Sequence, residues 1–220
     1  MLPRVVLHNA MSLDGRIDWF AADIGLYYEL ASRWQVDAHL AGSDTMLAME
    51  GELADDGEAP TPEVNPDDPR PLLVVPDSRG RLRKLHLLPK LPYWRGVLAL
   101  CSETTPRTHL SYLQEKRIEY LVAGQDHVDL RAALEALNAR YGVRTVHVDS
   151  GGTLNGVLLR AGLVDEISVL IHPSLVGGIT GRSIFRAPDL TSPQGVIALR
   201  LTHMERLQGD IVWLRYEVVR

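Results

Sequence analysis

The sequence has 220 residues and a single cysteine, Cys101, which excludes a disulfide framework and a zinc site built from several cysteines. No run approaches the roughly 20 apolar residues that span a bilayer. The eight histidines show neither H-x-x-x-H nor H-E-x-x-H spacing, so we expect no metal site. A G-x-S-x-G motif is also missing, which excludes an α/β-hydrolase. These absences favour an enzyme or binding protein that works without a metal.

Charge and length narrow the class further. The net charge of −5 argues against a nucleic-acid surface spread over the whole molecule. The N-terminus lacks a secretory pattern, because a short apolar run leads directly to the polar residues His8 and Asn9. We therefore expect a cytoplasmic protein that binds neither nucleic acid nor membranes. The length suits one domain, residues 1–220, or at most two small ones.

Short runs rich in Val, Leu and Ile alternate with stretches of helical periodicity. We predict strands, each buried on both faces, at 4–10, 38–42, 71–76, 97–101, 118–123, 145–148 and 165–172. We predict helices at 27–35, at 108–116, from Leu130 to a stop at Gly142, and from Thr153 to a stop at Gly162. Two further strands, 196–205 and 210–219, form a hairpin. The fold class is α/β: a three-layer sandwich with a mostly parallel sheet, helices on both faces and a C-terminal antiparallel hairpin.

Two segments stand apart by charge. Residues 50–68 carry eight acids, no base and three prolines, which predicts a long mobile surface loop over 50–70. Residues 79–95 then carry six bases and no acid. They form either a solvated basic face or a phosphate site.

Ligands of open α/β sheets bind beyond the carboxyl ends of the strands. Four predicted strand ends carry polar or glycine-rich turns: 9–16, 42–45, 77–79 and 148–156. Ser43 or Asp44 could cap a helix. Ser78 beside Arg79 suits a terminal phosphate monoester such as the 2′-phosphate of NADP. Gly151 and Gly152 before a helix allow close approach of a pyrophosphate, although the spacing is not that of G-x-G-x-x-G.

Three motifs in this order resemble the reductase family of riboflavin biosynthesis (RibD C-terminal domain-like), whose fold is dihydrofolate-reductase-like. They are Met11-Ser12-Leu13-Asp14-Gly15-Arg16, then Asp77-Ser78-Arg79, then Gly151-Gly152-Thr153-Leu154-Asn155-Gly156 with the residues that follow up to Gly178. The resemblance runs from Val5 to about Val219. It implies an NADPH-dependent reductase that reduces the ribose of a phosphoribosylamino-pyrimidine to a ribityl chain.

The resemblance also implies roles for individual residues. Cofactor contacts fall on Ala10, Thr45, Ser78, Arg79, Gly151, Gly152, Thr153, Leu154, Asn155 and Gly156. Substrate contacts fall on Ser12, Trp19, Arg33 and Asp149. The titratable candidates for catalysis are His8, Asp14 and Asp149, and the sequence does not choose among them.

The substrate half of the pattern departs from the family. His8 stands where Lys or Asn is usual, and Asp149 where Glu is usual. The stretch that leads to a second substrate arginine reads Ala54-Asp55-Asp56-Gly57. Two alternatives therefore stay open: a reductase of another heterocycle, carbonyl or imine, and a non-catalytic NADP-binding protein. We also expect a homodimer, with the 167–171 strand and the terminal hairpin as candidate interface elements.

Overall fold

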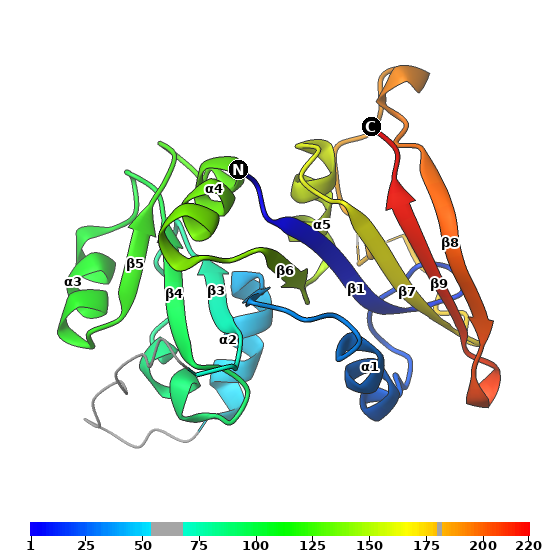
Figure 1. The fold of residues 1–220 in the computed structure, drawn as a ribbon, viewed down its shortest axis with the longest axis horizontal. Helices are drawn as coiled ribbons and strands as arrows, with labels where there is room; N and C mark the ends of the chain where they lie inside the picture. Colours follow the sequence, from blue (N-terminus) through cyan, green and yellow to red (C-terminus); the bar gives the residue numbers. More distant parts are fainter. Residues whose placement is uncertain (54–67, 180–181) are drawn as a thin grey trace. The chain divides into compact units, whose positions relative to one another are not determined.

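A computed structural model describes residues 1–53, 68–179 and 182–220 (Figure 1). These residues form two compact units. The first unit comprises Met1–Pro3 and Val36–Val146, and the second comprises Arg4–Gln35 and His147–Arg220. The single reductase domain expected over 1–220 stays a prediction.

The first unit is an alternation of parallel strands and helices. Its elements are β2 (Ala38–Leu40), α2 (Ser43–Glu52), β3 (Leu72–Pro76), the 3₁₀ helix η1 (Leu85–Lys90), β4 (Gly96–Cys101), α3 (Arg107–Glu115), β5 (Glu119–Val122) and α4 (Leu130–Tyr141). The strands pair in parallel in the order β5-β4-β3-β2. A further strand, β6 (Thr145–Val148), starts in the first unit and ends in the second.

Both faces of the central strands of the first unit are buried. Alternate residues such as Leu73 and Val75 of β3 belong to one apolar cluster with side chains of α2, η1 and α3. The intervening residues, including Val74 and Leu98, are equally inaccessible to solvent and face the other way, because side chains alternate along a strand. Two-sided burial explains why these strands read as continuous apolar runs.

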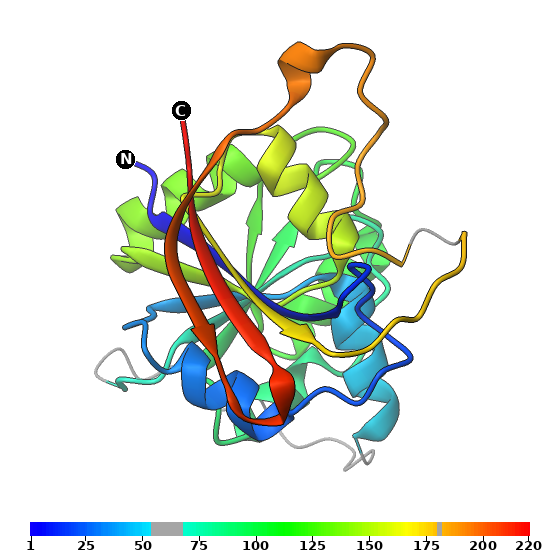
Figure 2. The same cartoon turned by 90° about the vertical axis from the view of Figure 1, so that its right-hand side faces the viewer.

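The second unit joins parallel and antiparallel pairing. Its elements are β1 (Arg4–Ser12), α1 (Ile24–Ala31), α5 (Gly152–Arg160), β7 (Glu166–His172), η2 (Pro193–Gly195), β8 (Leu199–Arg206), η3 (Gln208–Asp210) and β9 (Val212–Val218). β1 pairs in parallel with β7, whereas β9 runs antiparallel to both β7 and β8 (Figure 2). The predicted α/β class with mostly parallel strands and a C-terminal antiparallel hairpin is confirmed.

One predicted helix is displaced along the chain. The sequence predicted a helix at 27–35, but α1 runs from Ile24 to Ala31. Its N-cap is Asp23, whose Oδ1 accepts a hydrogen bond from the Leu26 N–H at 2.9 Å. A cap of this kind fixes where a helix begins. The prediction was wrong because it followed the apolar periodicity and did not use Asp23.

Other local predictions were also wrong. β5 lies at the edge of the pairing order and exposes Glu119 and Val122, so it is not buried on both faces. The cap of α2 is Gly42 rather than Ser43 or Asp44. Glu50, predicted to open a surface loop, is a buried residue of α2. The rest of that predicted loop, from 54 to 67, lies outside the described residues.

The basic segment 79–95 is more than a solvated face. Arg81 donates to the Ser43 hydroxyl (2.6 Å) and pairs with Asp44 (2.8 Å). The backbone N–H groups of Arg83 and Lys84 donate to the Glu50 carboxylate at 2.7–3.1 Å. Further along, η1 inserts leucines into the core of the first unit. Much of the basic run is therefore engaged with α2.

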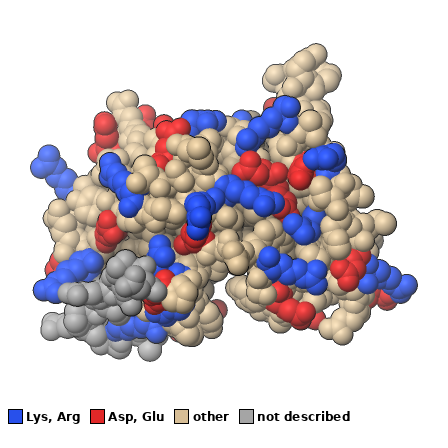
Figure 3. All heavy atoms as spheres, in the orientation of Figure 1, with Lys and Arg blue, Asp and Glu red and all other residues tan. Residues whose placement is uncertain are grey.

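Lys and Arg side chains are interspersed with Asp and Glu on the face shown in Figure 3, with no large area of one sign. Among the helices that the structure describes, none is long and apolar enough to cross a membrane.

Candidate active site

The turn after β1 is organised around the Asp14 carboxylate. The Ser12 hydroxyl donates to it at 2.6 Å, and the N–H groups of Val176 and Gly177 donate to it at 3.1 and 2.7 Å. The Ser12 hydroxyl also accepts from the Arg16 N–H at 3.0 Å. These hydrogen bonds, that from Ser12 foremost, lower the pKa of Asp14 to about 2. Asp14 is thus ionised at neutral pH and anchors the chain at 176–177.

His8 is at the centre of a buried hydrogen-bond chain. The Trp213 indole N–H donates to the Ser168 hydroxyl, and this hydroxyl lies 2.8 Å from Nδ1 of His8. Nε2 of His8 lies 3.1 Å from the Tyr27 carbonyl oxygen, which can only accept, so Nε2 carries the proton. Burial lowers the pKa of His8 to about 4. His8 is therefore neutral at pH 7, with both ring nitrogens occupied and no exposed surface.

Asp149 directly follows β6 and meets two tyrosines. Burial raises the pKa of Asp149, while hydrogen bonds with the hydroxyls of Tyr27 and Tyr28 act in the opposite direction. Burial and the nearby Asp149 in turn raise the pKa of Tyr27 well above its usual value. Since burial is the largest of these effects, the neutral carboxyl of Asp149 is favoured more than in water. A protonated carboxyl is a group that can give a proton to a substrate.

Tyr27 connects Asp149 to His8. The Tyr27 hydroxyl donates to the His8 backbone carbonyl at 2.8 Å. The Tyr27 hydroxyl also forms a hydrogen bond with Asp149, and this interaction lowers the pKa of the carboxyl and so opposes the larger effect of burial. Burial is therefore what makes Asp149 a candidate for proton donation.

The N-terminus of α5 is open to an anion. The first N–H groups of a helix have no partner within it, and the cap here is Gly151, which has no side chain to accept from them. A Cβ placed at Gly151 would meet only a methyl group of Ile17, at 3.7 Å. Thr153 is exposed and Leu154 half-buried. This end of the helix fits a phosphate or pyrophosphate.

The other two glycines of the motif serve packing. A Cβ on Gly152 would lie 1.9 Å from the Ser183 carbonyl oxygen, and one on Gly156 would lie 2.1 Å from that of Arg186. Between them, the fully buried Asn155 side chain donates to Asn9 Oδ1 at 2.9 Å. Gly152, Asn155 and Gly156 thus pack α5 against the segment 183–187 and against β1 of the same unit.

Three further predicted residues lie in the second unit. Arg33 is exposed, and its guanidinium lies 4.7 Å from the centre of the Trp213 ring. Trp19 is 83% exposed and adopts a positive φ of 66°, which is rare for an aromatic residue. Ala10 packs beside the buried cluster that contains Trp213 and Tyr27.

The remaining predicted cofactor residues belong to the first unit. Thr45 lies in the first turn of α2, whose cap Gly42 again has no side chain. Ser78 and Arg79 follow β3 in the loop 77–83, with Ser78 half-buried and Arg79 exposed.

Sequence reasoning missed the groups that surround the candidate acids. Tyr27 and Tyr28 were assigned only to a helix, and Ser168 only to a strand. The tyrosines contact Asp149 and Ser168 contacts His8, in each case across more than 110 residues of sequence. No local sequence pattern predicts such contacts. Within the described residues, no cluster of three or more His, Cys, Asp or Glu could hold a metal ion.

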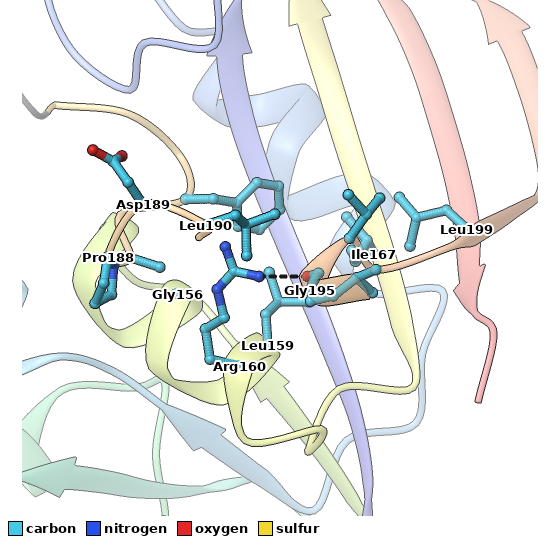
Figure 4. A pocket seen from close by; sticks show the side chains of 13 residues that line it. Gly156, Leu159, Arg160, Ile167, Pro188, Asp189, Leu190, Gly195 and Leu199 are labelled. Carbon is cyan, nitrogen blue, oxygen red and sulfur yellow. Dashed lines mark hydrogen bonds between the residues drawn. The ribbon is translucent and has the colours of Figure 1, made fainter. Parts of the chain in front are cut away.

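A pocket of about 390 Å³ lies beside the C-terminal half of α5 (Figure 4). Its walls include Leu159 and Ile167 as well as Leu190 and Leu199 from the chain that leads into β8. Arg160 reaches across it to donate to the Gly195 carbonyl at 2.8 Å. The pocket is mostly apolar and is separate from the open N-terminus of α5.

Comparison with known proteins gives the chain its family. The sequence-family model of the RibD C-terminal domain matches residues 3–213 of this chain. A 2,5-diamino-6-ribosylamino-4(3H)-pyrimidinone 5′-phosphate reductase from Methanothermobacter thermautotrophicus is 33% identical, over 96% of this chain and 97% of its own length. Its namesake from Archaeoglobus fulgidus is 32% identical over 81% of this chain and 84% of its own length.

A solved structure agrees in fold. The pyrimidine reductase-like protein from Corynebacterium diphtheriae superposes with a TM-score of 0.76 at 18% identity, covering 99% of this chain and 92% of that one. At this identity the likeness concerns the fold alone. The sequence match and the fold agree: the chain belongs to the RibD C-terminal domain family and is a homologue of the riboflavin-biosynthesis reductases.

Proposed function

We propose that the chain is an NADPH-dependent reductase of 2,5-diamino-6-ribosylamino-4(3H)-pyrimidinone 5′-phosphate. The observation that carries this proposal is the 33% identity over nearly the full length of both chains to a reductase of that name. NADPH, when bound, supplies the hydride that converts the ribosyl carbon into part of an open ribityl chain. The protein must then bind both molecules, align them and deliver one proton.

The residues fit a dinucleotide phosphate. In the second unit, the N-terminus of α5 at Gly151, Gly152, Thr153 and Leu154 would hold a pyrophosphate. In the first unit, Ser78 with Arg79 would hold a 2′-phosphate. Ala10 of the second unit and Thr45 of the first stay proposed cofactor contacts. Asn155 and Gly156 act indirectly, because they are buried and position α5.

Asp149 is our candidate for the proton donor. Opening the sugar ring leaves a developing alkoxide on the ring oxygen, and a neutral carboxyl can protonate it as the hydride arrives at the adjacent carbon. Asp14 is less suitable because it is ionised and already accepts three hydrogen bonds. His8 is less suitable because its proton is held by a backbone carbonyl. We assign both to positioning, although sequence reasoning had placed them beside Asp149 as catalytic candidates.

The substrate contacts follow from exposure and charge. Arg33 is exposed, and its guanidinium lies over the Trp213 ring. A contact with the face of a guanidinium does not use the N–H groups at its edge, which can bind a phosphate. Trp19 offers an exposed ring on which a pyrimidine can stack. Ser12 is fully buried, and its hydroxyl holds the turn after β1 by hydrogen bonds with Asp14 and with the Arg16 N–H, so we assign it to positioning.

The test is NADPH oxidation, followed by absorbance, with the pyrimidine phosphate as substrate. Asp149→Asn should lower kcat about 100-fold or more while leaving NADPH binding unchanged, since general acid catalysis contributes that much. Arg33→Ala should mainly raise KM. A matched control, Asp126→Asn at an exposed position, should keep the wild-type rate. Full activity of Asp149→Asn would contradict the assignment of the proton donor.

The two alternatives have distinct outcomes in the same assay. Binding of NADPH without turnover of this substrate, but with turnover of another heterocycle, carbonyl or imine, would indicate a different reductase of the same fold. Binding without any turnover would indicate a non-catalytic protein. Absence of NADPH binding would contradict all three readings.

We also infer a homodimer formed through β8. Among the described residues β8 pairs only with β9, so its other edge has free backbone groups. Leu199, Leu201 and Met204 on this strand are 43–69% exposed. The 167–171 strand, by contrast, is β7, which is buried between β1 and β9 and is unsuited to an interface. That part of the sequence-based expectation was wrong.

The oligomeric state can be measured by sedimentation. Leu201→Glu with Met204→Glu should convert a dimer into a monomer at micromolar concentration. Leu13→Glu, also at an exposed position but in the β1 turn, is the control and should stay dimeric. A wild-type monomer would remove the inference.

A further inference from the structure

The loop 77–83, which carries Ser78 and Arg79, is closed on itself by one buried acid. The Asp77 carbonyl accepts from the Gly80 N–H at 3.1 Å, and the Asp77 carboxylate accepts from the Leu82 N–H at 2.9 Å. Gly80 adopts a φ of +61°, so the chain reverses there in a conformation that favours glycine. Asp77 thus sets the loop's curvature, and Ser78 and Arg79 project from the curve.

Helix α3 and the turn before it support this loop from outside. The Thr105 hydroxyl donates to the Ser78 carbonyl at 3.1 Å. His109 of α3 is fully buried and lies against Gly80 so closely that a Cβ there would be 2.6 Å from the His109 Cβ and 2.8 Å from its Cγ. The backbone at Gly80 is therefore pressed directly onto the His109 side chain.

His109 also connects the two ends of the loop. Arg83 Nη1 lies 2.9 Å from His109 Nδ1, and a guanidinium can only donate, so Nδ1 must be the unprotonated nitrogen. The proton is then on Nε2, which faces the Asp77 carboxylate at 3.7 Å. Burial lowers the pKa of His109, in agreement with a neutral ring. One imidazole thereby touches the start, the turn and the end of the loop.

We propose that His109 is a positioning residue for cofactor choice, holding the loop 77–83 in the shape that points Ser78 and Arg79 at the 2′-phosphate of NADPH. The inference rests on the proposed function, because it needs the 2′-phosphate to bind at Ser78 and Arg79. The inference goes beyond that function because it makes the preference for NADPH over NADH depend on His109, a side chain that contacts neither cofactor. The reason is geometric: a two-pronged arginine contact is lost when its base moves by about an ångström.

The test measures the ratio of NADH to NADPH dissociation constants by tryptophan fluorescence. His109→Leu keeps most of the volume and removes both polar links, and should lower the ratio at least tenfold. His109→Gln retains an acceptor for Arg83 and a donor toward Asp77, and should restore part of it. Both variants must also be compared by urea unfolding, since a purely structural role would lower stability without changing the ratio.

A glycine pair supplies an independent arm. Gly80 and Gly142 have nearly the same positive φ, +61° and +65°. A Cβ at Gly80 would meet the His109 side chain, whereas a Cβ at Gly142 would meet nothing within 4 Å. Gly80→Ala should lower the ratio and Gly142→Ala should leave it unchanged. This arm decides the matter even if His109→Leu fails to fold.

Arg79→Ala separates the two proposals. If it lowers the ratio while folded His109→Leu and Gly80→Ala keep the wild-type ratio, the role of His109 is overturned and the proposed phosphate site stands. If Arg79→Ala itself keeps the wild-type ratio, the phosphate site is wrong and the role of His109 falls with it. A lower ratio in all three variants supports the inference.

Discussion

The two segments proposed to bind phosphates are built in different ways. In the first unit, the loop 77–83 is shaped by side chains, with Asp77 closing it and His109 supporting it. In the second unit, the N-terminus of α5 is placed by direct backbone contact, since Gly152 and Gly156 lie against the carbonyl groups of Ser183 and Arg186.

This difference predicts how each segment responds to change. A loop shaped by side chains can be altered in small steps by replacing them. A helix held by backbone contact cannot be altered in small steps, because any Cβ at the contact must displace the backbone segment that lies against it. Substitutions should therefore act gradually in the first unit and abruptly in the second.

The largest effect is expected at the helix glycines. Gly152→Ala places a Cβ 1.9 Å from the Ser183 carbonyl oxygen and Gly156→Ala places one 2.1 Å from that of Arg186. Each should lower the free energy of unfolding by about 3 kcal/mol or more, because backbone cannot move aside as a flexible side chain does. Urea denaturation measures this loss.

Gly51→Ala is the matched control. Gly51 also lies inside a helix, α2, but a Cβ there meets nothing within 4 Å. Alanine should raise stability by roughly 0.5–1 kcal/mol at such a position. Equal responses at Gly152 and Gly51 would contradict the assigned backbone contact.

The next effect compares one histidine from each unit: His8 of the second, which is fully buried, and His39 of the first, which is half-buried. Burial lowers the pKa of both His8 and His39 from 6.5 to about 4. The unfolded chain then binds more protons than the folded protein between these values. Stability is complete above pH 6.5 and falls as the pH drops to about 4, by about 3 kcal/mol for His8. The measurement is the free energy of unfolding from pH 4 to 7.

Single substitutions show which histidine causes the change in the free energy of unfolding with pH. His8→Gln and His39→Gln should each reduce the number of protons taken up on unfolding in this range by close to one. His127→Gln, at an exposed position, should leave the slope as it is. An unchanged slope in His8→Gln would mean that the ring is protonated in the folded protein.

A moderate effect is expected where a side chain holds backbone in the first unit. The buried Glu50 carboxylate accepts hydrogen bonds from the N–H groups of Arg83 and Lys84. Glutamine keeps one acceptor oxygen but loses the negative charge and places an NH2 group where the second oxygen accepts from the Arg83 N–H. Glu50→Gln should cost about 2 kcal/mol of stability, the range for hydrogen bonds to charged groups. Exposed Glu52→Gln, two residues on, should change it by less than about 0.5 kcal/mol. Similar values for the two would refute the buried role of Glu50.

The smallest effect is local and belongs to the second unit. Asp14→Asn should speed hydrogen exchange at the amides of Val176 and Gly177, which donate to the carboxylate, without shifting the urea midpoint. The wild-type protein should show the same acceleration as the pH falls from 3.8 through about 2, where Asp14 becomes protonated. Exchange at the neighbouring Ile171 amide, inside β7, serves as the reference.

The sequence predicted the elements well because apolar periodicity reports burial, and burial is what places strands such as β3 and β4. It failed where a single polar group decides a boundary. Asp23 moves the start of α1, and Glu50 joins α2 because the backbone of 83–84 needs an acceptor. Such pairings depend on tertiary contact, and composition cannot reveal them.

The sequence predicted the motifs of the candidate site but not the role of each residue in them. Glycines that let a phosphate approach and glycines that let a chain approach look alike in sequence, so 151–156 read as one motif although Gly152 and Gly156 serve packing. The sequence also could not choose among His8, Asp14 and Asp149. The choice depends on burial, which lowers the pKa of His8 and raises that of Asp149, and on the hydrogen bonds that lower the pKa of Asp14.

The pairing of β1 with β7 has a consequence for synthesis on the ribosome. Val6 lies opposite Glu166, so 160 residues of chain separate the partners, whereas β2 to β5 follow one another within a continuous stretch. At about 5–20 residues per second, β1 must wait roughly 10 to 30 seconds for its partner. During that interval the first unit can fold, while the strand that carries His8 and the Ser12 turn remains unpaired with β7. Chaperone capture or misassembly of the nascent chain is therefore expected to begin at β1.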